Sequence, residues 1–211
     1  MQPIFINNFL PDALYNFIHS YCILKYSNIE ELRPDGTNNT DSFINEYGDY
    51  AMETLLDMST SVVERNVGKK LFPVNAFLRI YDKGSLLKVH KDRIECEYTV
   101  ALCLGAYPSD LPYDIFSGNI DPNSDYKFFA DNRSGQDELV PLTIENKFSM
   151  IPNSALIFQG VNKFHWREFC KHDYFITVFL HYVDQNGEYA KYKFDERNRL
   201  GEERVHDPNA K

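Results

Sequence analysis

The sequence predicts a mainly β protein, an antiparallel sandwich or barrel supported by helices near its N-terminus. Short β-type runs separated by turn residues follow one another from Phe72 onward, whereas helical periodicity is confined to the first seventy or so residues. Aromatic residues make up 15% of the chain, which suits a β-rich interior. The 211 residues, 43% of them hydrophobic, are enough to bury one core. We therefore expect one domain, with a helical support region at 1–71 and a β core at 72–200.

Two amphipathic helices are predicted in the support region. The first follows Pro11 and the capping-type Asp12, with apolar residues at helical spacing: Leu14, Phe17, Ile18 and Tyr21. The second runs from about Asp49 to Val67 and has an apolar stripe of Met52, Leu55, Leu56, Val62, Val63 and Val67. Gly68 is placed to end it as a left-handed cap. Both helices are expected to cover the core.

Five runs are predicted to form strands, namely 74–81, 98–104, 148–158, 174–183 and 189–194. Residues 105–147 separate the second run from the third and are polar and aromatic, with several prolines. A loop of this length in a compact domain is usually functional. We therefore interpret 105–147 as a lid-like insertion that closes over a pocket.

Charge and composition exclude several partners. The chain has 31 acidic and 22 basic residues, and no Lys/Arg cluster is dense enough to neutralise a phosphate backbone, so nucleic acid is not expected. It has no secretory-type leader pattern and no run of eighteen apolar residues, so we expect a soluble, cytoplasmic protein without a membrane partner. The four cysteines lack CxxC spacing and are expected to be reduced and buried. Nothing in the sequence indicates an oligomeric state.

His90 and Asp92 form a candidate metal-binding pair. They are two residues apart, so in an extended chain their side chains leave from the same face. An HxD pair alone is a weak signal. Upstream, Arg79 and Tyr81 share one face of a predicted strand, and the turn at 82–85 then leads to His90.

A third ligand is predicted at His165. Residues 151–160 read as a turn, a buried strand and a second turn, and His165 follows almost at once. Two histidines and one carboxylate occupy one face of an octahedral iron and leave three positions open. His172 and His181 are rivals, but neither follows a strand and turn in this way, so core-edge or solvated roles are expected for them.

Four segments together resemble the Fe(II)/2-oxoglutarate oxygenases of the prolyl-hydroxylase type. They are RIYDKGSLLKVHKD at 79–92, YTVALCLG at 98–105, the stretch 156–182, and KFDERNRLG at 193–201. The resemblance extends from about Phe77 to Gly201 and is strongest to small bacterial and phage-type members. Each piece is unspecific, but their ordered combination is specific.

This resemblance implies a double-stranded β-helix, the cupin-like jelly roll, whose open mouth holds Fe(II). It implies a dioxygenase that uses 2-oxoglutarate as cosubstrate and O2 to hydroxylate a C–H bond, releasing succinate and CO2. The substrate class it favours is a peptide, of the prolyl type, or a free amino acid. By the same resemblance Tyr81 contacts the cosubstrate, and Thr177, on the last core strand, is a further candidate.

The sequence departs from the family at the residue that anchors the far carboxylate of 2-oxoglutarate. Family members carry Arg or Lys nine or ten residues after the distal histidine, where this chain has Tyr174 and Phe175. Arg79 is the preferred substitute because it shares a strand face with Tyr81. Its alternative role is to pair with a buried carboxylate. The rivals for the anchor are Arg167, Lys171 and, with less weight, Lys88.

Two other classes of function remain open from sequence. One is a cupin-like metal protein without oxygenase activity, and the other is a metal-free sandwich that binds a carbohydrate or peptide. The missing basic residue after His165 keeps the first of these open. Succinate formation on addition of iron and 2-oxoglutarate separates an oxygenase from both.

Overall fold

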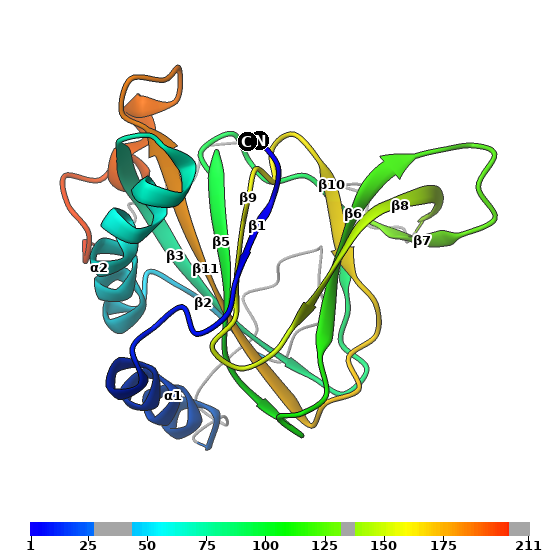
Figure 1. Cartoon of the computed structure of the whole chain (residues 1–211), viewed down its shortest axis with the longest axis horizontal. Coiled ribbons are helices and arrows are strands. Elements are labelled where there is room, and N and C mark those ends of the chain that lie inside the picture. The colour runs from blue at the N-terminus through cyan, green and yellow to red at the C-terminus, as the bar shows by residue number, and fades with distance from the viewer. Residues whose placement is uncertain (28–43, 132–137, 203–211) are drawn as a thin grey trace.

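The computed structural model describes residues 1–27, 44–131 and 138–202, which form two facing β-sheets with two helices outside one of them (Figure 1). The first sheet has six antiparallel strands in the order β1-β9-β5-β11-β3-β2. In that order the strands span Ile4–Ile6, Ala155–Phe158, Tyr98–Tyr107, Tyr174–Asp184, Leu71–Asp82 and Ile44–Tyr47. The three longest strands of this sheet, β5, β11 and β3, are adjacent to one another.

The second sheet has five strands that close on themselves in the order β10-β4-β7-β8-β6, with β6 pairing back to β10. In that order they span Phe164–Arg167, Leu87–His90, Lys127–Ala130, Glu138–Met150 and Tyr113–Ile120. Its pairings are antiparallel except for β4 with β7. This agrees with the predicted mainly β architecture.

The helices α1 (Asp12–Ser27) and α2 (Tyr50–Val67) lie on the outer face of the six-stranded sheet (Figure 1). The predicted ends of α2 are confirmed, since the Asp49 side chain accepts from the Met52 N–H and Gly68 adopts a left-handed φ of 70°. The predicted apolar stripe of α1 is wrong at Phe17, which is 66% exposed. The buried residues of α1 are Ile18 and Cys22.

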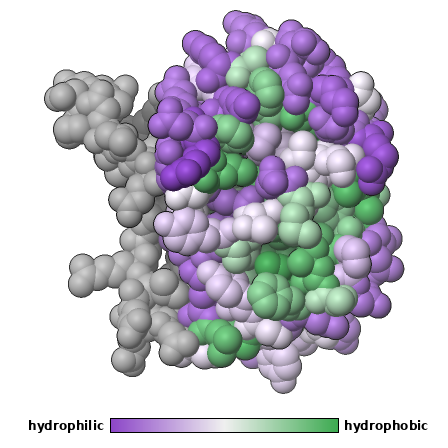
Figure 2. All heavy atoms as spheres, turned by 90° about the vertical axis from the view of Figure 1, so that its left-hand side faces the viewer, coloured by the Kyte–Doolittle hydropathy of each residue, from purple (hydrophilic) through white to green (hydrophobic). Residues whose placement is uncertain are grey.

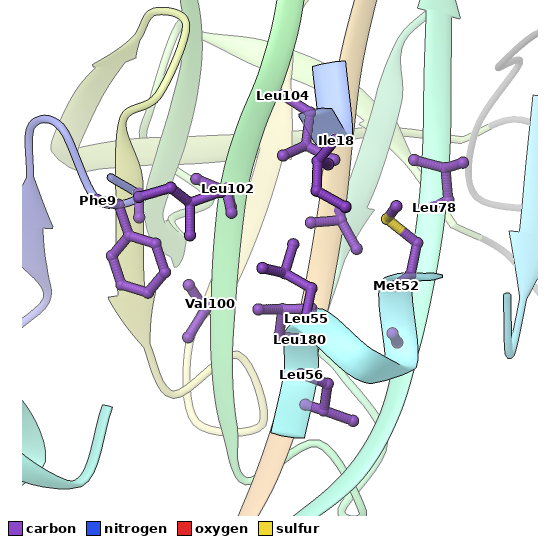
Figure 3. Close-up of a cluster of buried hydrophobic side chains, with 14 of the residues drawn as sticks. Phe9, Ile18, Met52, Leu55, Leu56, Leu78, Val100, Leu102, Leu104 and Leu180 are labelled. Atoms are coloured by element: carbon purple, nitrogen blue, oxygen red, sulfur yellow. The ribbon is translucent and has the colours of Figure 1, made fainter. Parts of the chain in front are cut away.

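Strand alternation divides the hydrophobic residues between two cores. Outward-facing residues of the six-stranded sheet pack against the helices, as Figure 3 shows for Leu78, Val100 and Leu180 beside Leu55 and Leu56 of α2. Inward-facing residues of the same strands pack between the two sheets: Tyr81, Ala101, Cys103, Phe175 and Phe179. Polar side chains on the inner face are therefore enclosed by both sheets.

The expectation that residues 105–147 form a lid loop is wrong over the described part of that segment. It contains β6, β7 and the first ten residues of β8, all paired in the second sheet. Phe116 and Phe128 are buried in a core cluster with Trp166, so these rings pack the sheet instead of covering a ligand. Residues 132–137 lie outside the described residues. Alternation was hard to see here because β8 is largely exposed and carries polar residues at many positions.

Two predicted strands also differ from the structure. Residues 189–194 fall in a 3-10 segment, Ala190–Glu196, whose residues Phe194, Asp195 and Glu196 all have positive φ. The run 148–158 is two strands, the end of β8 and β9, separated by a turn with Asn153 at φ 60°. The short strands β1, β2 and β4 were not predicted, since three or four residues give too little periodicity to read.

The surface on the helix side is mostly hydrophilic, with a group of hydrophobic residues among the polar ones (Figure 2). Exposed apolar side chains on the helices include Phe17 and Leu24 of α1 and Met58 of α2. Within the described ranges, no helix combines the length and apolar character needed to cross a membrane. All four cysteines are buried and unpaired, as predicted.

Candidate metal centre

The fold brings His90, Asp92 and His165 together at one end of the inter-sheet space. His90 ends β4, and β10 pairs with β4 so that His165 lies directly opposite it. Asp92 follows two residues after β4, and its backbone N–H donates to the Gly160 carbonyl at 3.1 Å. One ligand atom from each of the three side chains lies within 4.8 Å of the others. Two segments 75 positions apart thus form one cluster through strand pairing.

The three side chains are oriented as a set of metal ligands. Asp92 Oδ1 lies 3.5 Å from His90 Nε2 and 3.4 Å from His165 Nε2. The Nδ1 of each histidine lies against a backbone carbonyl, Lys88 at 2.8 Å and Lys163 at 3.2 Å. A carbonyl only accepts, so each Nδ1 must carry a proton, and in the neutral tautomer each Nε2 then offers its lone pair to a metal. Such an outer bond is how proteins fix the tautomer of a metal-binding histidine.

The electrostatics of the cluster favour the ligand forms of these groups. Burial lowers the pKa of His90, and the neighbouring His165 lowers it further, so the imidazole stays neutral. Burial alone would raise the pKa of Asp92, but its interactions with His165 and His90 hold it well below its ordinary value. A neutral imidazole and an ionised carboxylate are the forms that bind divalent metals.

Asp92 is supported from its far side by residues that sequence reasoning did not assign to the site. Thr99 Oγ1 donates to Asp92 Oδ2 at 2.9 Å, and His181 Nδ1 lies 3.2 Å from the same hydroxyl. Gly160 is required here, because a Cβ at this position would lie 1.9 Å from Asp92 Oδ2. The alternation of residues 175–181 could have placed His181 on the inner face. His172 is separate from this cluster, since its Nε2 donates to the Leu111 carbonyl at 2.7 Å.

A second polar group lies in the same inter-sheet space and contains Arg167, Tyr81 and Thr177. All three residues are fully buried. Arg167 Nη1 donates to the Tyr113 carbonyl at 2.6 Å, but its Nε and Nη2 have no hydrogen-bond partner among the described residues. The Tyr81 hydroxyl and Thr177 Oγ1 are likewise without a described partner. Buried donors are nearly always satisfied, so these three groups together are able to hold a polar ligand or ordered water.

Aromatic rings surround the Arg167 guanidinium. Its Cζ lies 4.7 Å from the ring centroid of Tyr113, 5.2 Å from that of Phe175 and 5.6 Å from that of Tyr81. No carboxylate of the described residues pairs with it. A buried cation that lacks a counter-ion is costly, so this environment is suited to an anion from outside the chain.

The other expected cosubstrate residues have different surroundings. Arg79 faces the interior as predicted, but its Nε donates to Asn45 Oδ1 at 2.8 Å and its guanidinium packs on Phe77. This amide is a partner of Arg79 that sequence reasoning did not name. Lys171 is exposed and lies outside the buried cluster. Lys88 is partly buried and supplies the carbonyl that orients His90.

A cavity of about 300 Å³ opens beside His165 between the two sheets. Its inner walls are apolar and come from both sheets: Ile115, Phe148, Leu156 and Phe158. Its polar lining includes Ser117, Asn146, Gln159 and the ion pair of Lys163 with Glu145. The volume is at the lower end of the range for small-molecule sites.

Comparison with known proteins gives a structural likeness only. No protein-family model matches the sequence, and no curated protein sequence matches it either. Among solved structures, a Pseudomonas putida prolyl-4-hydroxylase superposes with a TM-score of 0.54 at 14% identity, covering 85% of this chain and 91% of that one. A Trichoplax adhaerens prolyl hydroxylase, in complex with a hypoxia inducible factor peptide, gives 0.56 at 15% identity, covering 89% and 86%.

Small-molecule enzymes are equally similar. The epimerase SnoN from nogalamycin biosynthesis, in complex with Fe3+, α-ketoglutarate and nogalamycin RO, gives a TM-score of 0.58 at 12% identity, covering 86% of this chain and 78% of that one. At sequence identities this low, structural similarity establishes only the fold, and the activity has to be inferred from the residues of the site. The chain therefore has the jelly-roll fold of the 2-oxoglutarate and Fe(II)-dependent oxygenases, as its sequence predicted.

Proposed function

We propose that this protein is a non-haem Fe(II)/2-oxoglutarate-dependent dioxygenase. The observation that carries the proposal is that one inter-sheet space contains both a His-Asp-His cluster and a buried arginine beside two hydroxyls, with donors of all three side chains lacking partners among the described residues. A metal site alone would explain only the first group. A metal together with a dicarboxylate explains both.

His90, Asp92 and His165 would hold the iron. Two neutral imidazoles and one carboxylate form a set that suits Fe(II) and leaves coordination positions for cosubstrate and oxygen. Bound iron and 2-oxoglutarate would supply the oxidation of a substrate C–H bond, with release of succinate and CO2. The chain's own part is to orient these ligands and to keep the site enclosed between the sheets.

Arg167, Tyr81 and Thr177 would hold 2-oxoglutarate. Its far carboxylate would neutralise the Arg167 guanidinium, whose Nε and Nη2 are adjacent donors able to bind two carboxylate oxygens. Tyr81 and Thr177 would donate their unpaired hydroxyls to the same ligand. A charge-assisted hydrogen bond contributes about 1.5–3 kcal/mol, enough to make Arg167 the main determinant of cosubstrate affinity.

Arg167 is a better anchor than Arg79, which the sequence favoured. The Arg79 Nε already donates to Asn45, and its guanidinium carbon lies 4.8 Å from the Phe77 ring centroid. Binding 2-oxoglutarate there would disrupt contacts that the protein has made. At Arg167 the same ligand completes an unsatisfied site.

For the substrate, we propose a peptide or a free amino acid hydroxylated at an unactivated C–H. The apolar walls of the cavity beside His165 suit an aliphatic group close to the metal, and the polar residues at Lys163 and Glu145 suit an amide or zwitterionic neighbour. Among similar structures, one is a prolyl hydroxylase bound to a peptide. The net charge of −9 disfavours phosphate-rich substrates.

The test is succinate formation by the purified protein with Fe(II), 2-oxoglutarate and a panel of peptides and amino acids, with mass spectrometry for a gain of one oxygen. Coupled succinate and hydroxylated product would support the proposal. Metal binding without any succinate would indicate a cupin-like protein of another kind. Succinate coupled to oxidation of a nucleobase or lipid would refute the substrate class but support the metal chemistry.

A further inference from the structure

We infer that Thr99 and His181 are positioning residues that make Asp92 bind its metal through a single carboxylate oxygen. The inference rests on the proposed metal role of Asp92 and deepens it, because it concerns how many coordination positions the carboxylate uses. Neither residue belongs to the metal cluster itself.

The hydrogen bonds among these three residues have only one consistent direction. The Thr99 hydroxyl donates its proton to Asp92 Oδ2, which accepts it at 2.9 Å. Thr99 then has only lone pairs left for His181 Nδ1 at 3.2 Å, so that nitrogen must be the donor. The result is a chain from His181 through Thr99 to Asp92.

In this series of hydrogen bonds the two oxygens of Asp92 have different contacts. Oδ2 is engaged by Thr99, while Oδ1 faces His90 Nε2 and His165 Nε2 at 3.5 and 3.4 Å. A carboxylate held this way offers one oxygen to a metal. If it rotated to offer both, it would occupy one of the three positions needed for cosubstrate and oxygen.

The supporting residues are well placed to resist such a rotation. Thr99 and His181 lie directly opposite each other on β5 and β11, two long central strands of the six-stranded sheet. Both are buried, at 1% and 8% exposure. Behind the carboxylate, Gly160 leaves just enough room for Oδ2 in its present place. The geometry of Asp92 is therefore fixed by the scaffold and not by the metal alone.

The experiment compares Co(II) binding and its visible ligand-field spectrum in the wild type, Thr99→Val and Thr99→Ser. Valine keeps the shape and β-propensity of threonine but cannot donate, so we expect about 10- to 100-fold weaker Co(II) binding and an altered spectrum. Serine restores the hydroxyl and should restore both. Thr54→Val is the matched control, because the exposed Thr54 hydroxyl donates to the Tyr50 carbonyl within α2, away from the metal cluster. It should leave both readouts unchanged.

A second variant tests the direction of the chain. His181→Gln removes the imidazole but keeps the Thr99–Asp92 bond, so its Co(II) affinity should fall less than that of Thr99→Val. Wild-type affinity and spectrum in Thr99→Val would overturn the inference, as would a larger loss in His181→Gln. If the wild type itself bound no Co(II), the metal centre and the proposed function would fail first, which is a distinct result.

Discussion

The Arg167 guanidinium carbon lies 5.2 Å from the ring centroid of Phe175, so an arginine of the five-stranded sheet reaches across the interior to the facing sheet. Phe175 stands at the position where the resemblance led us to expect a basic residue. Although Phe175 replaces the expected basic residue, this region still contains a positive charge, that of Arg167. The Phe175 ring packs against a cation that comes from β10 instead of β11.

Replacing Arg167 by methionine should weaken 2-oxoglutarate binding by at least about tenfold, since a charge-assisted bond of about 1.5–3 kcal/mol is lost. Calorimetry with Co(II) in place of iron measures this without turnover. The Tm of the cosubstrate-free variant should rise, because the mutation removes a buried cation that has no described counter-ion.

Arg79→Met is the control for that experiment. Its Tm should fall, because the Arg79 Nε bond to Asn45 is lost, and its 2-oxoglutarate affinity should change less than that of the Arg167 variant. The reverse ranking of the two affinities would move the anchor to Arg79.

Alanine at His90, Asp92 or His165 should each reduce Co(II) or Fe(II) affinity more than any supporting substitution, that is, by more than about 100-fold. His172→Ala is the matched control, because its imidazole is buried but bonds the Leu111 carbonyl and lies outside the cluster. Metal titration measures these affinities. If His172→Ala lost the metal while His165→Ala kept it, the assignment of His165 as a ligand would be wrong.

Gly160→Ala should abolish tight metal binding. A Cβ there would lie 1.9 Å from Asp92 Oδ2 and 3.1 Å from His165 Cε1, so one or both ligands must move. Gly68→Ala is its counterpart. That glycine has φ 70° with open space around it, so alanine should lower the Tm through backbone strain while metal affinity is unchanged. Equal metal affinity in both variants would contradict the assigned role of Gly160.

The metal-free protein should lose stability on acidification below pH 6.5, in part through His181. Burial lowers the pKa of His181 from 6.5 to about 4, so between these values the unfolded chain takes up a proton that the folded chain does not. The free energy of unfolding should therefore fall by about 1.4 kcal/mol per pH unit from this group, and His181→Gln should show a correspondingly shallower slope. Urea denaturation at several pH values measures both slopes, and identical slopes would contradict the prediction.

Local sequence patterns were sufficient to predict much of the fold and the three residues that cluster as a candidate metal site. The ends of α2 could be predicted because Asp49 and Gly68 act within one turn of the helix they cap. His90 and Asp92 could be paired because i and i+2 share a face in extended chain, and His165 because a turn, a strand and a second turn lead up to it. Such features depend on neighbours in the chain.

Residues 105–147 could not be predicted in this way. The pairing of β6 with β8 cannot be read from the composition of either strand. Many residues of β8 are exposed, so the strand has no clear alternation of apolar and polar residues. The aromatic residues of this segment looked like a cover for a ligand, but they are core residues because the second sheet closes on itself.

The sequence by itself determined that a β-rich chain carries two histidines and an aspartate with metal-ligand spacing, because spacing and alternation are properties of the local chain. Only the tertiary structure decided which buried arginine has donors without a partner in the described part of the chain, and which residues hold Asp92 in place. Among the described residues, Arg79 donates to Asn45, whereas Arg167 contacts aromatic rings and donates to the Tyr113 carbonyl. His181 comes within hydrogen-bonding distance of Thr99 through pairing of β5 with β11, a contact across 82 positions. The hydrogen-bond partners of buried polar groups often come from residues far apart in the sequence, so they are determined only when the strands have paired into sheets.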